Sequence, residues 1–160
     1  DWEVGLVSAI PPVVTGFAIW FNGRGADRDK RYNLRVAIPL MLGGVILACS
    51  TLVTADMRWL IMAVYSIATA CQLCFFGSYW TMNSLLIRPA AVGAGFGIIN
   101  GIGNLGGFVG PYVGGWVKDT TGSLPASTAI FGGAVVLAGV IALALTGAVR
   151  REMAAREAIV

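Results

Sequence analysis

Two asparagines within a long uncharged stretch are the polar groups best placed in this sequence to bind a ligand. Asn100 and Asn104 lie one helical turn apart, eleven and fifteen residues after Pro89. At about 1.5 Å per residue, a helix that begins at Pro89 places both amides near the centre of a hydrocarbon core. A carboxamide at that depth needs a partner, so the pair either contacts a bound substrate or bonds to neighbouring helices.

A second set of polar and aromatic residues lies in the preceding apolar stretch. Its members recur at steps of three and four, which places them on one face of a helix, with Trp80 beside that face. They are Thr69, Gln72, Phe76, Tyr79 and Asn83. This spacing indicates a helix that lines a cavity.

The sequence offers no catalytic or metal-binding set to accompany these groups. It contains no histidine, and its three cysteines all lie in apolar stretches. Cys71 and Cys74 have the spacing of a redox or zinc pair, but no second pair exists, so packing is their expected role. The glycines from Gly101 to Gly107 superficially resemble a phosphate-binding loop, yet no strand precedes them. We therefore expect a protein that is not an enzyme and that uses no cofactor and no metal.

The composition is that of a membrane protein. Hydrophobic residues make up 57% of the 160 residues and charged residues 12%, whereas soluble domains carry about 25% charged residues. Five stretches lack any charged residue over roughly the twenty positions that a membrane-crossing helix needs. They are 4–21, 36–53, 59–87, 89–117 and 124–149. Because these runs do not alternate as β-barrel strands do, we predict an all-α, polytopic membrane helix bundle without a nucleic-acid partner.

The distribution of basic residues predicts the orientation. Segment 22–35, the expected loop between the first two spans, contains five of them, and the positive-inside rule assigns it to the cytoplasm. By alternation Arg88 and the tail 150–160 are also cytoplasmic, so only Arg58 and Lys118 of the eleven basic residues lie outside. We predict a multi-pass protein of the inner (plasma) membrane with a cytoplasmic C-terminus. Five spans that start outside also predict further helices before residue 1.

The five stretches should differ in how they pack. The second (36–53) and fifth (124–149) are apolar nearly all round, so their helices are expected to face lipid. The fourth contains ten glycines between Gly93 and Gly115, in a spacing that should let another helix approach closely.

The connecting segment carries a recognisable motif. Gly23, Asp27, Arg28 and Arg31 match the pattern G-x-x-x-D-R-x-x-R, which resembles the cytoplasmic loop motif of the major facilitator superfamily. Asp27 could sit at a helix end and pair with a nearby arginine, forming a latch that breaks when the bundle opens. The alternative is an ordinary solvated, positively charged loop.

The segment 99–115, continuing through Lys118 and Asp119 to 121–123, extends this resemblance. It is similar to the eleventh helix and following loop of the anion:cation symporter branch of that superfamily, whose members carry organic anions such as tartrate, phthalate and sugar acids. In that register the five spans correspond to helices eight to twelve of a twelve-helix fold, so the chain would be the C-terminal part of such a transporter.

The resemblance implies a function and a site. It implies alternating-access symport of a small organic anion with a proton or another cation, with substrate contacts from the tenth and eleventh helices. These contacts fall on Ser78, Trp80 and Asn100, and more weakly on Tyr79 and Asn104. No Asp, Glu or His lies inside any of the five spans, so the resemblance implies that the N-terminal half supplies the charges for anion binding and coupling.

Other functions remain open from the sequence. Within the same superfamily, a drug exporter or a sugar transporter would show the same spans. From another class, a structural or channel-forming membrane subunit would also be helical and apolar, although the rings of charge or filter-like carbonyl motifs typical of channels are not evident.

Overall fold

The computed structural model describes residues 2–53 and 57–157, and throughout these ranges the regular structure is helical. The all-α prediction is confirmed over this part of the chain. The elements are α1 (Trp2–Ser8), α2 (Ile10–Asp29), α3 (Tyr32–Cys49), η1 (Ser50–Leu52), α4 (Arg58–Leu73), α5 (Phe76–Leu86), η2 (Pro89–Ala91), α6 (Val92–Thr121), α7 (Leu124–Ala144) and α8 (Thr146–Glu157).

Five helical segments are long and apolar enough to cross a membrane, as far as length and composition can tell. They overlap the five predicted stretches, and all but the third extend further at one end, where polar residues continue the helix. The segments are Gly5–Asp29, Tyr32–Leu52, Trp59–Leu86, Pro89–Thr121 and Leu124–Ala155. The predicted tail 150–160 begins inside α8, and residues 158–160 lie outside the described part of the chain.

Most of the segment 22–35 is helical, so its backbone differs from the expected loop. The helix α2 continues to Asp29, and α3 begins at Tyr32. Lys30 ends α2 in the left-handed conformation, with a φ of 55°, and its backbone N–H donates to the carbonyl of Ala26 at 2.9 Å. This is a helix-terminating geometry that glycine usually adopts, and here it turns the chain within two residues.

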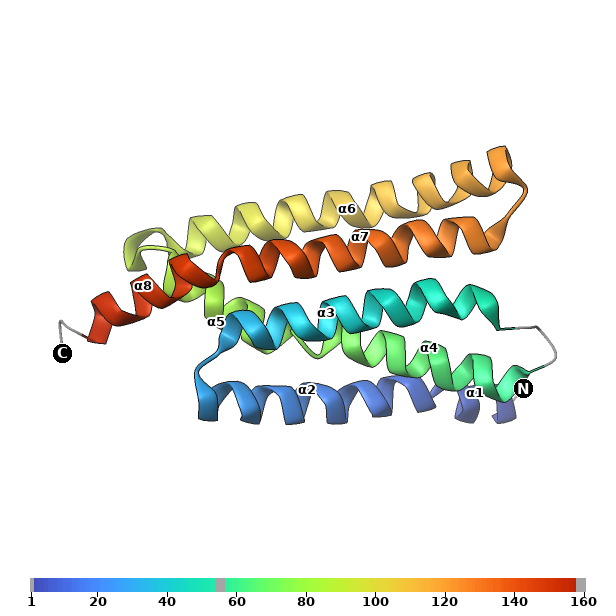
Figure 1. The fold of residues 1–160 in the computed structure, drawn as a ribbon, viewed down its shortest axis with the longest axis horizontal. Coiled ribbons are helices and arrows are strands. Elements are labelled where there is room, and N and C mark those ends of the chain that lie inside the picture. Colours follow the sequence, from blue (N-terminus) through green and yellow to red (C-terminus); the bar gives the residue numbers. More distant parts are fainter. Residues whose placement is uncertain (1, 54–56, 158–160) are drawn as a thin grey trace.

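The third apolar stretch is interrupted near its middle. The helix α4 ends at Leu73 and α5 starts at Phe76, with a turn at Cys74 and Phe75 between them. In Figure 1, α5 leaves the line of α4 and rises toward α8. The break therefore gives the two halves of this segment different directions.

The helices lie side by side with α3 at the centre (Figure 1). One side of α3 packs against α7 and another against α4, which in turn packs against α2, while α6 packs mainly against α7. The helices α3 and α7 form the most extensive helix pair in the described chain, and both also keep exposed apolar side chains, among them Leu42 and Leu137. The expectation that the second and fifth spans face lipid stays a prediction. The exposed side chains of α3 are Ile38, Leu42, Val45 and Cys49.

Glycines explain why α3 and α7 approach so closely. A Cβ added at Gly132 would lie 2.6 Å from the carbonyl oxygen of Gly44, and one added at Gly44 would lie 2.6 Å from that of Gly132. Farther along, Gly139 packs against the backbone of Ala37 and the side chain of Met41. Small residues of this kind let helix backbones come into contact inside a membrane.

The glycines of α6 have a different environment. Added Cβ atoms at Gly93, Gly97 and Gly101 would meet nothing within 4 Å. Large apolar side chains of the same helix, among them Ile102 and Leu105, are exposed. The predicted close approach to these glycines is therefore not made by any helix in the described part of the chain, and α6 presents an uncovered surface.

The end of the bundle that holds the α2–α3 turn is closed by a small core. Ala26, Tyr32, Met82 and Val149 come from α2, α3, α5 and α8 and are all buried. The side chain of Asn33 also donates to the Thr146 hydroxyl at 2.6 Å, joining α3 to the start of α8. The helix α8 is thus packed onto the bundle.

We predict that Gly132→Ala destabilises the protein while Gly133→Ala does not. The new methyl at position 132 would overlap the backbone of Gly44 and Ala48, whereas at position 133 it would meet nothing within 4 Å. Overpacking costs about 1–3 kcal/mol, more than the ~0.5–1 kcal/mol that alanine gains over glycine in a helix. Thermal unfolding in detergent measures both variants, and equal midpoints would contradict the close α3–α7 contact.

Candidate functional site

The three predicted site residues of α5 point in different directions. Successive residues of a helix are turned by about 100° from one another. Ser78 is 2% exposed. Tyr79 packs against the core formed by α3 and α7, at Val36, Leu40 and Ala142. Trp80 is half-buried, and its ring lies 4.7 Å from that of Phe96 on α6, measured between centroids.

The two predicted asparagines lie on the uncovered surface of α6. Both are exposed, and the Asn104 side-chain amide donates to the backbone carbonyl of Asn100 at 2.9 Å. Phe96, Asn100 and Asn104 are four residues apart, so they share one face of the helix. Because Trp80 packs on Phe96, it lies beside this face. We call Trp80, Phe96, Asn100 and Asn104 the amide face.

The structure therefore divides the predicted site residues into two groups. Trp80, Asn100 and Asn104 belong to one open face, where carboxamide groups and aromatic rings can meet a polar molecule. Tyr79 is half-buried, packs on the core of α3 and α7 and has its ring 5.4 Å from that of Trp80, measured between centroids. Ser78 is buried with no hydrogen-bond partner for its hydroxyl among the described residues.

The residues of the loop motif lie near the α2–α3 turn. Asp27 and Arg28 are exposed and, with Arg24 and Gly25, line a shallow pocket. A Cβ at Gly23 would meet nothing within 4 Å, and Arg31 contributes its backbone N–H, which donates to the Asp29 carboxylate at 3.0 Å.

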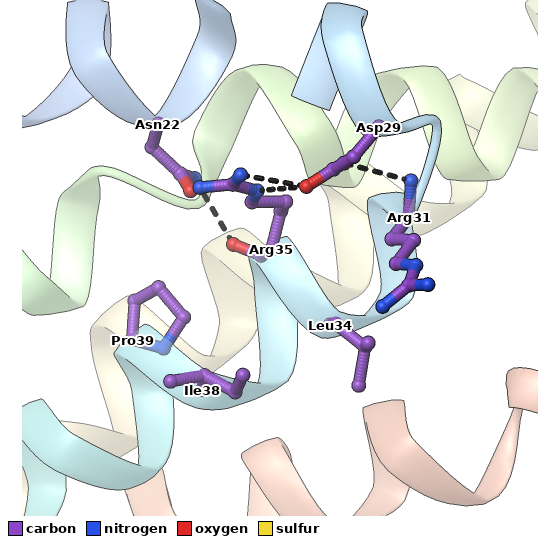
Figure 2. A pocket seen from close by; sticks show the side chains of 7 residues that line it. All are labelled: Asn22, Asp29, Arg31, Leu34, Arg35, Ile38 and Pro39. Atoms are coloured by element: carbon purple, nitrogen blue, oxygen red, sulfur yellow. Dashed lines mark hydrogen bonds and ion pairs between the residues drawn. The ribbon is translucent and has the colours of Figure 1, made fainter. Parts of the chain in front are cut away.

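The ion pair at this turn uses Asp29 rather than Asp27. In the described part of the chain, the Arg35 guanidinium lies 2.6 Å from the Asp29 carboxylate, and Figure 2 shows the pair bridging α2 and α3. The hydrogen bonds from Arg35 and from the Arg31 backbone lower the pKa of the Asp29 carboxyl, which lies beyond the apolar stretch 4–21, below its ordinary value of 3.8.

A residue that the sequence analysis missed lies beside this ion pair. Asn22 is buried, and its side-chain NH₂ group donates to two backbone carbonyls, that of Arg35 at 3.0 Å and that of Cys74 at 2.8 Å. With Pro39 and the ion pair, Asn22 lines a cavity of about 270 Å³ (Figure 2). The signal was present in the sequence, because Pro39 follows Arg35 by four residues and cannot donate to its carbonyl.

Within the described residues, no group of three or more His, Cys, Asp or Glu side chains could hold a metal ion. The candidate site therefore consists of neutral hydrogen-bonding groups and aromatic rings. Such groups can orient a polar ligand, but they do not supply a charge.

Comparison with known proteins finds transporters. The chain is 33% identical over 145 residues to a protein of Agrobacterium vitis named as a tartrate transporter, covering 90% of this chain and 33% of that protein. It is 30% identical over 130 residues to the quinolone resistance transporter of Acinetobacter baumannii, covering 79% of this chain and 29% of that protein. It is 29% identical over 163 residues to GudP of Bacillus subtilis, named for galactarate and D-glucarate transport, covering 93% of this chain and 34% of that protein. The chain thus spans about a third of the length of these curated relatives.

No family model and no solved structure matches the chain. The relatives are named as transporters, so the expectation that the chain is not an enzyme is confirmed.

We predict that Asp29→Asn lowers stability slightly at neutral pH and that this effect disappears in acid. The lowered folded-state pKa means that the pair stabilises the fold above pH 3.8 and ceases to do so as the pH falls through the folded-state pKa. Because both side chains are about one third exposed, the stabilisation is below about 1 kcal/mol. Thermal unfolding in detergent from pH 7 to acid measures it. Asp27→Asn is the control, and an equal effect of both substitutions would contradict the assignment of the pair to Asp29.

Proposed function

We propose that this chain, which is similar over nine tenths of its length to a protein named as a tartrate transporter, forms the C-terminal part of a secondary transporter of the major facilitator superfamily. Its substrate is a small organic anion, a sugar acid or a dicarboxylate, which it moves by alternating access together with a proton or another cation. The observation that carries this proposal is the similarity to proteins named for tartrate and for galactarate and D-glucarate transport.

The amide face supports this substrate class. Tartrate and the sugar acids carry several hydroxyl groups, which the carboxamides of Asn100 and Asn104 can both donate to and accept from. The ring of Trp80 offers a flat apolar surface beside them. The uncovered surface of α6 is consistent with a site completed by helices that lie before residue 1 in the whole transporter.

The charges needed for binding and coupling belong, in this proposal, to the N-terminal half. An anion at membrane depth requires a cationic partner, and proton coupling requires a group that changes its charge. The stretches 59–87 and 89–117, which contain the amide face, have no ionisable acid or base among Asp, Glu, His, Lys and Arg.

The arrangement of the basic segments supports the proposed orientation. The α2–α3 turn, the start of α6 and the helix α8 lie at the same end of the bundle in Figure 1. These are the segments that the positive-inside rule assigns to the cytoplasm. We therefore propose that this end, with the C-terminus, faces the cytoplasm and that the protein resides in the inner membrane.

A second candidate within the same superfamily is a drug exporter. The similarity to the quinolone resistance transporter favours it, at 30% identity over 130 residues. An exporter of an aromatic compound would use Trp80 and Phe96 more than the two amides. Transport measurements separate the two candidates.

We predict that the complete transporter, reconstituted in vesicles, takes up one of a panel of radiolabelled sugar acids and dicarboxylates, faster with an inward proton gradient. Asn100→Ala should raise the KM for that anion roughly two- to tenfold, because a hydrogen bond to a neutral hydroxyl contributes about 0.5–1.5 kcal/mol. Ile98→Ala, an exposed position two residues away on α6, should leave uptake unchanged.

Two results would contradict parts of this proposal. If the folded protein takes up no organic anion but extrudes a quinolone, the protein is a drug exporter and the symporter proposal is wrong. If Asn100→Ala and Ile98→Ala both leave the KM unchanged, Asn100 does not contact the substrate.

A further inference from the structure

Proline at position 39 creates a backbone group that needs an outside partner. Pro39 lies inside α3 and has no N–H, so it cannot donate to the carbonyl of Arg35, four residues earlier. The side chain of Asn22, on α2, donates to that carbonyl at 3.0 Å (Figure 2). A neighbouring helix thus replaces the hydrogen bond that the proline removes.

The break between α4 and α5 creates a second such group. In a continuous helix the N–H of Ser78 would donate to the carbonyl of Cys74, but this bond is not formed, although both residues lie in the described part of the chain. The Asn22 side chain donates to the carbonyl of Cys74 at 2.8 Å. A buried carbonyl without a donor is costly, and most of all inside a bilayer, where water cannot replace the bond.

The side-chain NH₂ group of Asn22 therefore donates to the free carbonyl at each interruption, the one at Pro39 and the one between α4 and α5. A carboxamide nitrogen carries two hydrogens, and at Asn22 the two acceptors lie in different segments, one in α3 and one in the turn between α4 and α5. The residue is 9% exposed, so water does not readily take its place. The two bonds connect α2 to the first part of α3, before Pro39, and to the point where α5 leaves the line of α4.

We propose that Asn22 is a positioning residue, which fixes the direction of α5 and thereby holds Trp80 against Phe96 at the amide face. The importance of Asn22 for substrate binding rests on the proposed transport function. Its role in fixing the direction of α5 does not. The helix α5 has no continuous backbone hydrogen bonding to α4 at Cys74, so the contact from Asn22 restrains its first turn. Loss of that contact lets α5 tilt and moves Trp80, which lies six residues beyond Cys74.

The test compares Asn22→Ala with the double variant Asn22→Ala, Pro39→Ala in the complete protein in detergent. Alanine at position 39 restores an N–H that can bond to the Arg35 carbonyl, but it leaves the Cys74 carbonyl without a donor. Ser66→Ala is the control, because the buried Ser66 hydroxyl bonds only within α4, to the Met62 carbonyl at 2.7 Å. The emission of Trp80 is isolated by subtracting the spectrum of the same variant carrying Trp80→Phe.

Asn22→Ala should lower the unfolding midpoint by roughly 2–10 °C and shift the Trp80 emission to longer wavelength as the ring leaves Phe96. The double variant should recover part of the midpoint and keep the shifted emission. Ser66→Ala should leave the Trp80 emission unchanged.

Three results would overturn the proposal: unchanged Trp80 emission in Asn22→Ala, full recovery of that emission in the double variant, or a double variant that does not fold. None of these readouts uses transport, so the absence of any transported anion would refute the proposed function and leave this inference standing.

Discussion

Backbone carbonyls without a helical partner are the constraint on which this bundle depends. Each span must satisfy its own peptide groups, because hydrocarbon offers no alternative donor. Pro39 in α3, Pro111 in α6 and the turn between α4 and α5 all break that rule, and the first and last of these share one partner. The amide of Asn22 donates to the free carbonyls of Arg35, before Pro39, and of Cys74, in the α4–α5 turn, so both points are linked to α2. The two irregular points are thus held by the same side chain, which links α2, α3 and the end of α4.

Close packing between helices also holds the bundle together. It is much more extensive between α3 and α7 than between α6 and α7. The helices α3 and α7 are joined along their length by the contacts of Gly44, Gly132 and Gly139, and the bond from Asn33 to Thr146 joins α3 to the start of α8. The contacts of α6 with α7 are fewer and lie toward their shared hairpin, where the Ser127 hydroxyl donates to the carbonyl of Gly114 at 2.6 Å. The chain thus combines a tightly packed pair of helices with one whose surface is open to a partner.

The sequence predicts where the helices lie along the chain better than it predicts which helices pack together. Hydropathy identifies five apolar segments because crossing a bilayer requires an uninterrupted apolar length. It does not show which side of a helix is covered, so Ser78 and Tyr79 could not be separated from Trp80 before the packing of α5 was known. The choice of Asp29 over Asp27 as the partner of Arg35 follows from the turn at Lys30, which no charge pattern indicates. The role of Asn22 depends on contacts 13 and 52 residues away.

A neutral site has a consequence for how the proposed transporter would work. Amides and aromatic rings recognise the shape and the hydroxyl groups of an anion, but they compensate little of the cost of removing its charge from water. In the proposed transporter, binding to this half alone would therefore be weak, and the anion would be held tightly only when charges from the other half are brought against it. Substrate recognition then requires both halves at once, so the binding free energy is coupled to their relative position. A cationic group on α6 would bind the anion without the other half and would weaken that coupling.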